Sequence, residues 1–313
     1  MLTLLLKRLA FSIPLIILVS LMTFLLVSLS PTDVAYTLLG ARATPEQLEA
    51  VREQLGLNLP LWQQYANWLV SAVQGDLGSS LLNGQPVLVA VGQRVEPTVA
   101  LLVLTMIVTS IIGVVVGVAG ALRGGWVARL TDALGLIGVA VPGFLIGLAL
   151  IVLFAVQLKV LPPSGYSGVA SGSGPWIRTL ILPVIALAAG SIGLIAKQVR
   201  AAMTDALSSE YVRNLTANGF RKSSIIYRHA LRSAAVPVLA MMGVTLVGML
   251  GSSVFIEQVF GIPGIGGLAV QATVAKDLPV IQGVTVIYVL IVVVVNLLLD
   301  IAYALANPKV RIS

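Results

Sequence analysis

Cysteine is absent from this chain of 313 residues, and histidine occurs once, at His229. Without thiols the chain forms no disulfide and offers no thiolate nucleophile. A single histidine cannot build a metal site alone, and we expect His229 to be a solvated side chain among basic residues. The sequence also lacks G-x-x-x-x-G-K-[ST], so it has no phosphate loop of that type for a nucleotide. No metal site and no catalytic residue are predicted.

Charge is also scarce, because only 10% of the residues are Asp, Glu, Lys or Arg, while 58% are hydrophobic and the mean hydropathy is +1.02. About 20 apolar residues in a helix cross a hydrocarbon core of about 30 Å, and a span must satisfy its own backbone hydrogen bonds. We therefore predict an all-α membrane protein. Its six transmembrane helices fall in charge-free runs of at least 18 residues, at 9–32, 97–122, 133–158, 179–196, 233–256 and 278–299.

The basic residues predict the orientation. Placing both termini in the cytoplasm puts 13 of the 19 Lys and Arg residues inside, leaving 6 outside. That asymmetry follows the positive-inside rule. The net charge of +7 is thus a topology signal and an attraction to anionic lipid, and it indicates no nucleic-acid partner. The inner set is Lys7, Arg8, Arg123, Arg129, seven residues between 197 and 232, Lys309 and Arg311.

The segment 33–96 is the one large region between spans on the outer side. Thr44 as N-cap before Pro45 predicts a helix that ends near Gly56 and Pro60. A second amphipathic helix, 61–73, carries Trp62, Tyr65 and Trp68. It fits either a helix at the membrane interface or a small packed cap held by these aromatics.

Small residues recur within the spans at helix-packing spacing and predict close helix approach. The pairs are Gly113 with Gly117, Gly143 with Gly147, and Gly248 with Gly251. At the outer end of the fifth span, Glu257 precedes a Pro-Gly turn. A carboxylate there is costly unless hydrated or paired, so Glu257 is either a functional residue or a hydrated interfacial glutamate.

The island 197–232 holds seven of the 19 basic residues between two apolar runs. We predict one helix over 204–218, with Gly219 as the left-handed residue after it, and a second helix that begins at Ser223 or Ser224. Their apolar faces can lie against the bundle or a partner. A solvated basic loop is the alternative. The face residues are Leu207, Tyr211 and Leu215 in the first helix and Ile226 and Ala230 in the second.

Particular residues of this island resemble the EAA loop of bacterial ABC-importer permeases, a docking surface for a separate ATPase. They are Ser209-Glu210-Tyr211-Val212-Arg213, Ala217-Asn218-Gly219, His229-Ala230-Leu231-Arg232 and Pro237. The likeness covers nearly the whole chain, because the Ile-Pro-Gly-Ile-Gly turn at 262–266, the segment 277–280 and the C-terminal segment 307–311 follow in the family's order. The chain is similar to the first permease subunit of dipeptide, oligopeptide and nickel ABC importers, of the dipeptide-permease B type.

The resemblance implies the type I ABC-importer permease fold in a multi-pass protein of the bacterial cytoplasmic (inner) membrane. It divides the chain into 1–32, 33–96 and a permease core of 97–313. It also implies a second homologous permease, two ATPase subunits that bind ATP and Mg, a substrate-binding protein outside, and membrane lipid. The expected substrate is a short peptide, with nickel or another small solute as the alternative.

The family pattern also implies site residues. The ATPase-docking residues are Glu210, Tyr211, Arg213, Leu215, Ala217, Gly219 and Phe220, and those of the outer gate or binding-protein contact are Glu257, Phe260, Ile262 and Pro263. Family members commonly have Ala-Arg-Ala-Lys-Gly at 215–219. Here Thr216 and Asn218 replace the two basic residues, so the charge complementarity with the ATPase is expected to differ.

Two other classes of function compete with a transporter subunit. An intramembrane enzyme needs convergent polar catalysts, but the spans offer Asn296 and scattered hydroxyls without a His, Cys or acid pair. An independent channel or ion-coupled carrier usually has ionisable groups at mid-membrane, whereas here they lie at the ends of the spans. Both are disfavoured.

Overall fold

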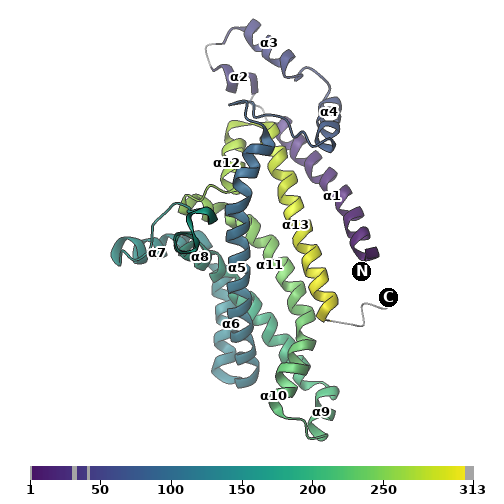
Figure 1. Cartoon of the computed structure of the whole chain (residues 1–313), viewed down its shortest axis with the longest axis vertical. Coiled ribbons are helices and arrows are strands. Elements are labelled where there is room, and N and C mark those ends of the chain that lie inside the picture. Colours follow the sequence, from purple (N-terminus) through teal and green to yellow (C-terminus); the bar gives the residue numbers. More distant parts are fainter. Residues whose placement is uncertain (1, 30–33, 41–42, 307–313) are drawn as a thin grey trace. The chain divides into compact units, whose positions relative to one another are not determined.

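The computed structural model describes residues 2–29, 34–40 and 43–306, and this part of the chain is helical. Its only β-type pairing is an isolated antiparallel bridge between Ser79 and Pro86. Figure 1 follows the helices along the chain. They form two compact units, one made of 1–96 and 263–294 and the other of 97–262 and 295–313.

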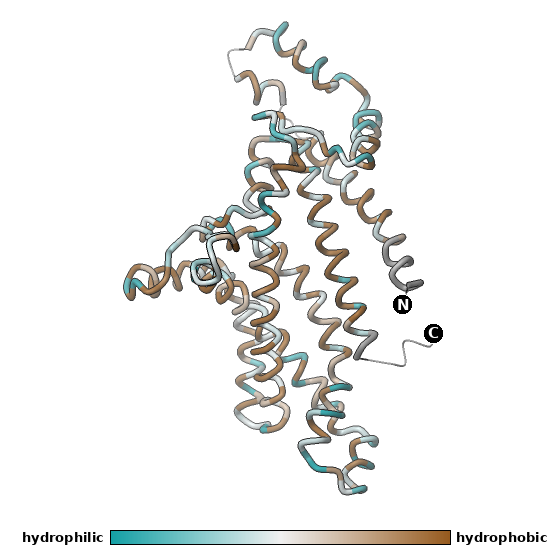
Figure 2. The backbone as a smooth tube through the Cα atoms, in the orientation of Figure 1, coloured by the Kyte–Doolittle hydropathy of each residue, from teal (hydrophilic) through white to brown (hydrophobic). Residues whose placement is uncertain are grey.

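Five helices among the described residues are long and apolar enough to cross a membrane. They coincide with five of the six predicted spans, and hydrophobic residues follow one another along them (Figure 2). Residues 30–32 of the first predicted span lie outside the described residues, as do Lys309, Arg311 and the segment 307–311. The five are α1 (Leu2–Ser28), α5 (Val87–Arg123), α8 (Ser173–Ser208), α11 (Leu231–Phe260) and α13 (Leu278–Ala306).

The predicted continuous helix over 133–158 is wrong. Helix α6 (Gly125–Ala140) ends before Val141-Pro142. A new helix, α7 (Gly143–Leu150), begins after this break and is followed by a π-helical turn, Ile151–Gln157. Pro142 has φ −58° and ψ 130°, which is incompatible with a helix interior, and proline has no backbone N–H to donate. Counting charges cannot detect this break, because both sides of it are apolar.

The predicted helices of the outer segment are confirmed. Helix α3 (Pro45–Gln54) begins with a capping box, in which Gln47 N donates to Thr44 Oγ1 (3.3 Å) and Thr44 N donates to Gln47 Oε1 (3.0 Å). Helix α4 (Leu61–Val73) has the predicted bounds, and a short helix, α2 (Val34–Leu39), precedes both. The reciprocal cap satisfies two backbone donors that a helix start otherwise leaves free.

Helix α4 is held on α1 by Tyr65. Its hydroxyl donates to the carbonyl of Ile17 (3.0 Å) and lies 2.9 Å from Ser20 Oγ, while its ring is 5.6 Å from that of Phe24. Tyr65 is buried, whereas Trp62 is 73% exposed. Of the two alternatives for 61–73, the face with Tyr65 thus forms a packed cap, and the face with Trp62 is open.

The turn between α12 (Ile265–Ala275) and α13 is clamped to the segment after α4. The buried Asp277 accepts hydrogen bonds from Ser80 Oγ (2.5 Å) and Leu81 N (3.1 Å). These bonds compensate the carboxylate for its loss of water. A core of buried side chains lies beside the clamp, including Leu77, Val87, Val91, Ile265, Ile281 and Val284.

Close helix approach in the second unit confirms part of the glycine prediction. A Cβ at Gly113 would lie 2.7 Å from Ile195, and one at Gly117 would lie 2.5 Å from the Ala196 carbonyl oxygen. The second pair is also partly in tight contact, since Gly147 faces the ring of Phe260. For Gly248 and Gly251 the structure shows no close approach, because no atom of the described residues lies within 4 Å of an added Cβ at either position.

Candidate functional site

The predicted helix 204–218 is divided by Ser209. Helix α8 continues to Ser208, Ser209 is extended (φ −66°, ψ 150°), and α9 (Glu210–Ala217) starts in a new direction. Ser209 Oγ accepts from Val212 N at 3.4 Å, so a serine side chain supplies the cap that the new helix needs. Figure 1 shows α9 and α10 (Lys222–Ser224) together at one end of the second unit.

The end of α9 confirms the prediction for Gly219. This residue has φ +79°, in the left-handed region where glycine has no steric penalty. Its conformation lets Phe220 N donate to the carbonyl of Leu215 (3.1 Å) and Gly219 N donate to that of Thr216 (3.0 Å). The chain therefore leaves α9 in a sharp turn that is built by hydrogen bonds.

Three buried side chains anchor this segment to the bundle: Val212 of α9, and Ile225 and Ala230 of the π-helical turn Ile225–Ala230. Ala230 belongs to the core that Val199 and Met203 of α8 also form. The second helix starts at Lys222, slightly earlier than predicted, and Arg221 before it makes no side-chain cap. Predicted face residues Leu207, Leu215 and Ile226 are half-buried.

Aromatic side chains lie on the exposed face of the segment. Tyr211 Oη is 2.8 Å from His229 Nδ1, and the ring of Phe220 meets the same imidazole edge-on, with 6.1 Å between ring centroids. Tyr211 is 53% exposed and Phe220 48%. His229 thus contacts two aromatic rings and is half-buried, so it is less solvated than predicted. We call Tyr211 and Phe220 the aromatic surface.

Most predicted docking residues are at the protein surface. Glu210, Arg213, Ala217 and Gly219 are exposed together with the aromatic surface, and Leu215 is half-buried. Thr216 and Asn218 are also exposed, so the two positions without a basic residue present neutral groups. Figure 2 shows hydrophilic residues gathered along this segment. The arrangement combines apolar rings with charges, which is a common composition of a protein contact surface.

The residues predicted for the outer gate are mostly buried, unlike the predicted docking residues. Glu257, Phe260 and Ile262 are buried, and among the predicted four only Pro263 is exposed. Glu257 Oε1 accepts from Thr98 Oγ1 at 2.6 Å, so this glutamate is paired inside the protein and is not a hydrated interfacial group. Phe260 ends α11 and its carbonyl accepts from Gly165 N (2.8 Å), which ties the outer loop to the helix end.

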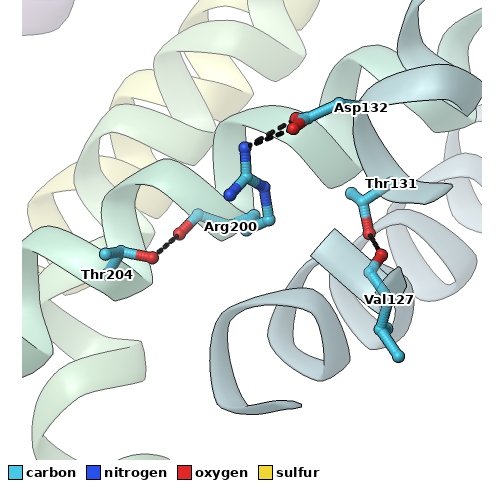
Figure 3. A network of polar contacts seen from close by, with 5 residues as sticks. All are labelled: Val127, Thr131, Asp132, Arg200 and Thr204. Carbon is cyan, nitrogen blue, oxygen red and sulfur yellow. Dashed lines mark hydrogen bonds and ion pairs between the residues drawn. The ribbon is translucent and has the colours of Figure 1, made fainter. Parts of the chain in front are cut away.

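Sequence reasoning missed a polar junction between α6 and α8 (Figure 3). Arg200 Nη2 donates to both carboxylate oxygens of Asp132, at 2.6 and 2.8 Å. Thr204, one turn after Arg200, donates to its carbonyl, and Thr131 donates to that of Val127. Asp132 directly precedes an apolar run and Arg200 lies a few residues after another, and neither position in the sequence indicates that the two charges pair. The junction links α6 to α8 shortly before α8 gives way to α9.

The sequence matches two family models that together cover most of the chain. Residues 1–102 match the N-terminal part of a binding-protein-dependent transport system membrane component. Residues 109–312 match the binding-protein-dependent transport system inner membrane component. The second match includes the segment of α9 and the aromatic surface.

Three relatives are similar over nearly their full length. A probable peptide ABC transporter permease protein of Sinorhizobium fredii is 41% identical, with 98% of each chain covered. A putative peptide transport system permease protein of Brucella abortus is 39% identical, and a glutathione transport system permease protein of Escherichia coli is 36% identical, each with 99% of both chains covered.

Proposed function

Because the chain belongs to the family of binding-protein-dependent transport system inner membrane components, we propose that it is a membrane-spanning subunit of an ATP-driven importer of short peptides. The peptide assignment rests on the relatives that are called peptide or glutathione permeases, glutathione being a tripeptide. Nickel or another small solute is the alternative. Selection of the substrate is assigned to the binding protein outside.

The proposed topology has six crossings and both termini in the cytoplasm. The five long helices supply five crossings, and the broken segment 133–158, which contains the end of α6, α7 and the π-helical turn after it, supplies the other. The basic side chains of 197–232 then face the cytoplasm. Since the chain has no cysteine, single-cysteine variants test this directly. Asn214→Cys should react with an impermeant maleimide only in inside-out vesicles, and Gln54→Cys only in right-side-out vesicles; the reverse pattern contradicts the topology.

The observation that carries the function is the geometry of α9. Tyr211 of α9 and Phe220 just after it are exposed, whereas Val212 of α9 is buried, and α9 contacts both α8 and the π-helical turn that leads into α11. A displacement of α9 is therefore transmitted to two long helices. Such a lever can couple an ATPase to the bundle if the ATPase contact favours one of two bundle states over the other.

The partners in this proposal are a second homologous permease, two ATPase subunits and a binding protein outside. ATP and Mg are bound by the ATPase subunits, and this chain contributes the pathway without catalysing a reaction. The turn at 261–264 would form part of the outer gate. There Gly261 and Pro263 are exposed, whereas Glu257 and Phe260 support the turn from within.

Co-purification from detergent-solubilised membranes of the native host tests the docking surface. In the double variant Tyr211→Ser/Phe220→Ser we expect the ATPase subunits to be lost while the second permease remains. The control is Tyr36→Ser, an exposed tyrosine of α2 on the other side of the proposed topology (49% exposed). Retention of the ATPases by the double variant, or a wild-type assembly without any ATPase, would refute this function.

A further inference from the structure

An open groove of about 600 Å³ lies in the second unit, between the end of the π-helical turn Ile151–Gln157 and the start of α8. Its volume is in the usual range of ligand sites, about 300–1,000 Å³. The two charged residues that line it, Lys159 and Arg178, are both basic and both exposed. We call this site the basic groove. Neither α9 nor the turn at 261–264, on which the transport proposal rests, contributes a described residue to its lining.

The two charges of the basic groove lack an acidic partner among the described residues. None of those that line the groove is acidic, and the sequence has no Asp or Glu between Asp132 and Asp205. Arg178 Nη2 donates to the carbonyl of Val160 (3.0 Å), but neither basic side chain forms an ion pair within the described part of the chain. A cleft whose charges share one sign concentrates counter-ions. The basic groove therefore favours an anion.

Both charges lie where an apolar run ends. Lys159 directly follows the charge-free run 133–158, and Arg178 directly precedes the run 179–196. The loop between these runs joins two consecutive crossings of the proposed topology, so both charges lie at the outer boundary of the membrane. Basic side chains at the ends of a span reach toward the headgroup layer. The anion that is always present at this level is the phosphate of a phospholipid.

The neighbouring surface distinguishes a lipid from a soluble protein as the source of the anion. Val156, Leu158 and Val160 lead from the apolar run to the groove and are 59%, 55% and 50% exposed. Tyr166 of the loop accepts a hydrogen bond from Trp176 Nε1 of α8 (2.8 Å), and both residue types are enriched at membrane–water interfaces. A phospholipid carries acyl chains next to its phosphate, so it covers the apolar side chains and neutralises the cations together. An acidic protein surface does only the second.

The backbone of Lys159 supports a role for its side chain. Its φ of +53° is in the left-handed region, where a residue with a Cβ is disfavoured and glycine is not. A lysine at such a position combines an unfavourable backbone with an exposed ammonium group. Strain of this kind clusters at ligand sites. It also provides a test, because glycine relieves the backbone and removes the charge.

We propose that the basic groove binds the phosphate of an anionic phospholipid of the outer leaflet. Lys159 and Arg178 pair with the phosphodiester, and the acyl chains lie along Val156 and Leu158. A headgroup without a cation of its own, as in phosphatidylglycerol, leaves its negative charge for these two residues, whereas phosphatidylcholine carries a quaternary ammonium. A lipid bound here links the end of the π-helical turn to the start of α8. The proposal rests on the proposed crossing at 133–158 but on no ATPase and no particular substrate.

The test uses the complete chain, as purified with its partners, in detergent with equal amounts of phosphatidylglycerol and phosphatidylcholine that have the same acyl chains. Native mass spectrometry counts the molecules of each lipid that remain bound. One basic residue near the membrane surface changes the affinity for an anionic lipid about 5-fold, so the pair predicts a change of about 25-fold. Basic residues at 197–232 also attract anionic lipid, so the readout is the change in preference that each variant causes.

Substitutions assign the preference to the basic groove. Lys159→Gly and Arg178→Gln should each lower the preference for phosphatidylglycerol about 5-fold, and the double variant about 25-fold. Arg178→Lys keeps the charge and should keep most of the preference. Arg52→Gln is the matched control, since it also removes one charge from the outer side, but Arg52 Nη1 is paired with Glu49 Oε2 (3.3 Å). In phosphatidylcholine alone, Lys159→Gly should not lower the Tm, because glycine suits the left-handed backbone.

A double variant with unchanged preference overturns the proposal, and so does an equal loss from Arg52→Gln, which would show attraction by net charge alone. The double variant is also tested for binding of the substrate-binding protein in bilayers of phosphatidylcholine. Weaker binding there, with the lipid preference unchanged, would show that the groove docks a protein instead. None of these results bears on ATPase docking at α9. A failure of the crossing at 133–158 is recognised separately, because Asn214→Cys and Gln54→Cys would then react from the same side.

Discussion

Replacing Gly219 by alanine tests whether the sharp exit from α9 is needed for docking. At φ +79° an alanine is disfavoured by about 1–2 kcal/mol, because its Cβ approaches the carbonyl oxygen. Among the described residues, no neighbouring atom lies within 4 Å of an added Cβ, so side-chain crowding adds nothing to this cost. The full backbone penalty therefore falls on the hydrogen-bonded turn that positions Phe220.

The assay is the Kd of the ATPase subunit for the permease in nanodiscs. If the left-handed turn is required for docking, a penalty of about 1–2 kcal/mol weakens binding about 5- to 30-fold. Asn tolerates this backbone region better than Ala, so Gly219→Asn should lose less than Gly219→Ala. The affinity for the ATPase should therefore be highest with Gly at position 219, lower with Asn and lowest with Ala.

Gly248→Ala is the matched control. Gly248 is in the interior of α11 with helical backbone, and the part of the chain that the structure describes places no atom within 4 Å of an added Cβ there. Alanine there should leave docking unchanged and favour the helix by about 0.5–1 kcal/mol. A Gly219→Ala variant that binds the ATPase as tightly as the wild type, or an Asn variant that binds it more weakly than the Ala variant, would show that docking does not need the left-handed turn.

Three further substitutions have expected outcomes. Tyr65→Phe removes a hydrogen bond to a carbonyl of α1 and should cost about 1 kcal/mol, visible as a lower Tm in detergent; an unchanged Tm contradicts the packed cap. Gly117→Ala places a Cβ 2.5 Å from the Ala196 carbonyl oxygen and should lower the Tm by more than Gly248→Ala does, whereas equal effects would show that α5 and α8 do not pack closely. Thr98→Val removes the hydroxyl that donates to Glu257 and should cost about 1–3 kcal/mol of stability, measured by chemical unfolding, and a neutral result would mean that this bond adds nothing.

The long helices were predictable from the sequence because membrane spans depend on composition over about 20 residues. Local capping was predictable as well. Thr44 with Gln47 supplies a complete capping box, and Gly219 is a residue that suits the left-handed position. These features depend on the chain within a few residues, so the local sequence is sufficient to identify them.

The breaks in the helices and the polar pairs between distant helices were not predictable from the local sequence. Pro142 can stand inside or before a membrane helix, and nothing local decides that α6 ends at Ala140. Ser209 is a favourable N-cap, but an apolar pattern continues through it. The bond from Thr98 to Glu257 and the ion pair of Arg200 depend on helices far apart in the sequence, which only the tertiary structure brings together.

Within the candidate site, the docking residues were predicted through the family resemblance, and the structure shows that most of them are exposed. Val212 anchors α9, although the predicted apolar face emphasised Tyr211. The reason is the new direction that the chain takes at Ser209. It rotates the helix relative to a continuation of α8, and so it changes which side chains face the bundle.

The central claim is that α9 docks an ATPase subunit, and cross-linking from a single introduced cysteine tests it most directly. The chain has no cysteine of its own, so Ala217→Cys, at an exposed position of α9, is the only reactive thiol of this subunit. In native membranes treated with a short thiol-reactive cross-linker, we predict a covalent adduct with the ATPase, and none from Gln54→Cys in the outer segment. An Ala217→Cys adduct only with a second permease copy, or no adduct at all, would contradict the account.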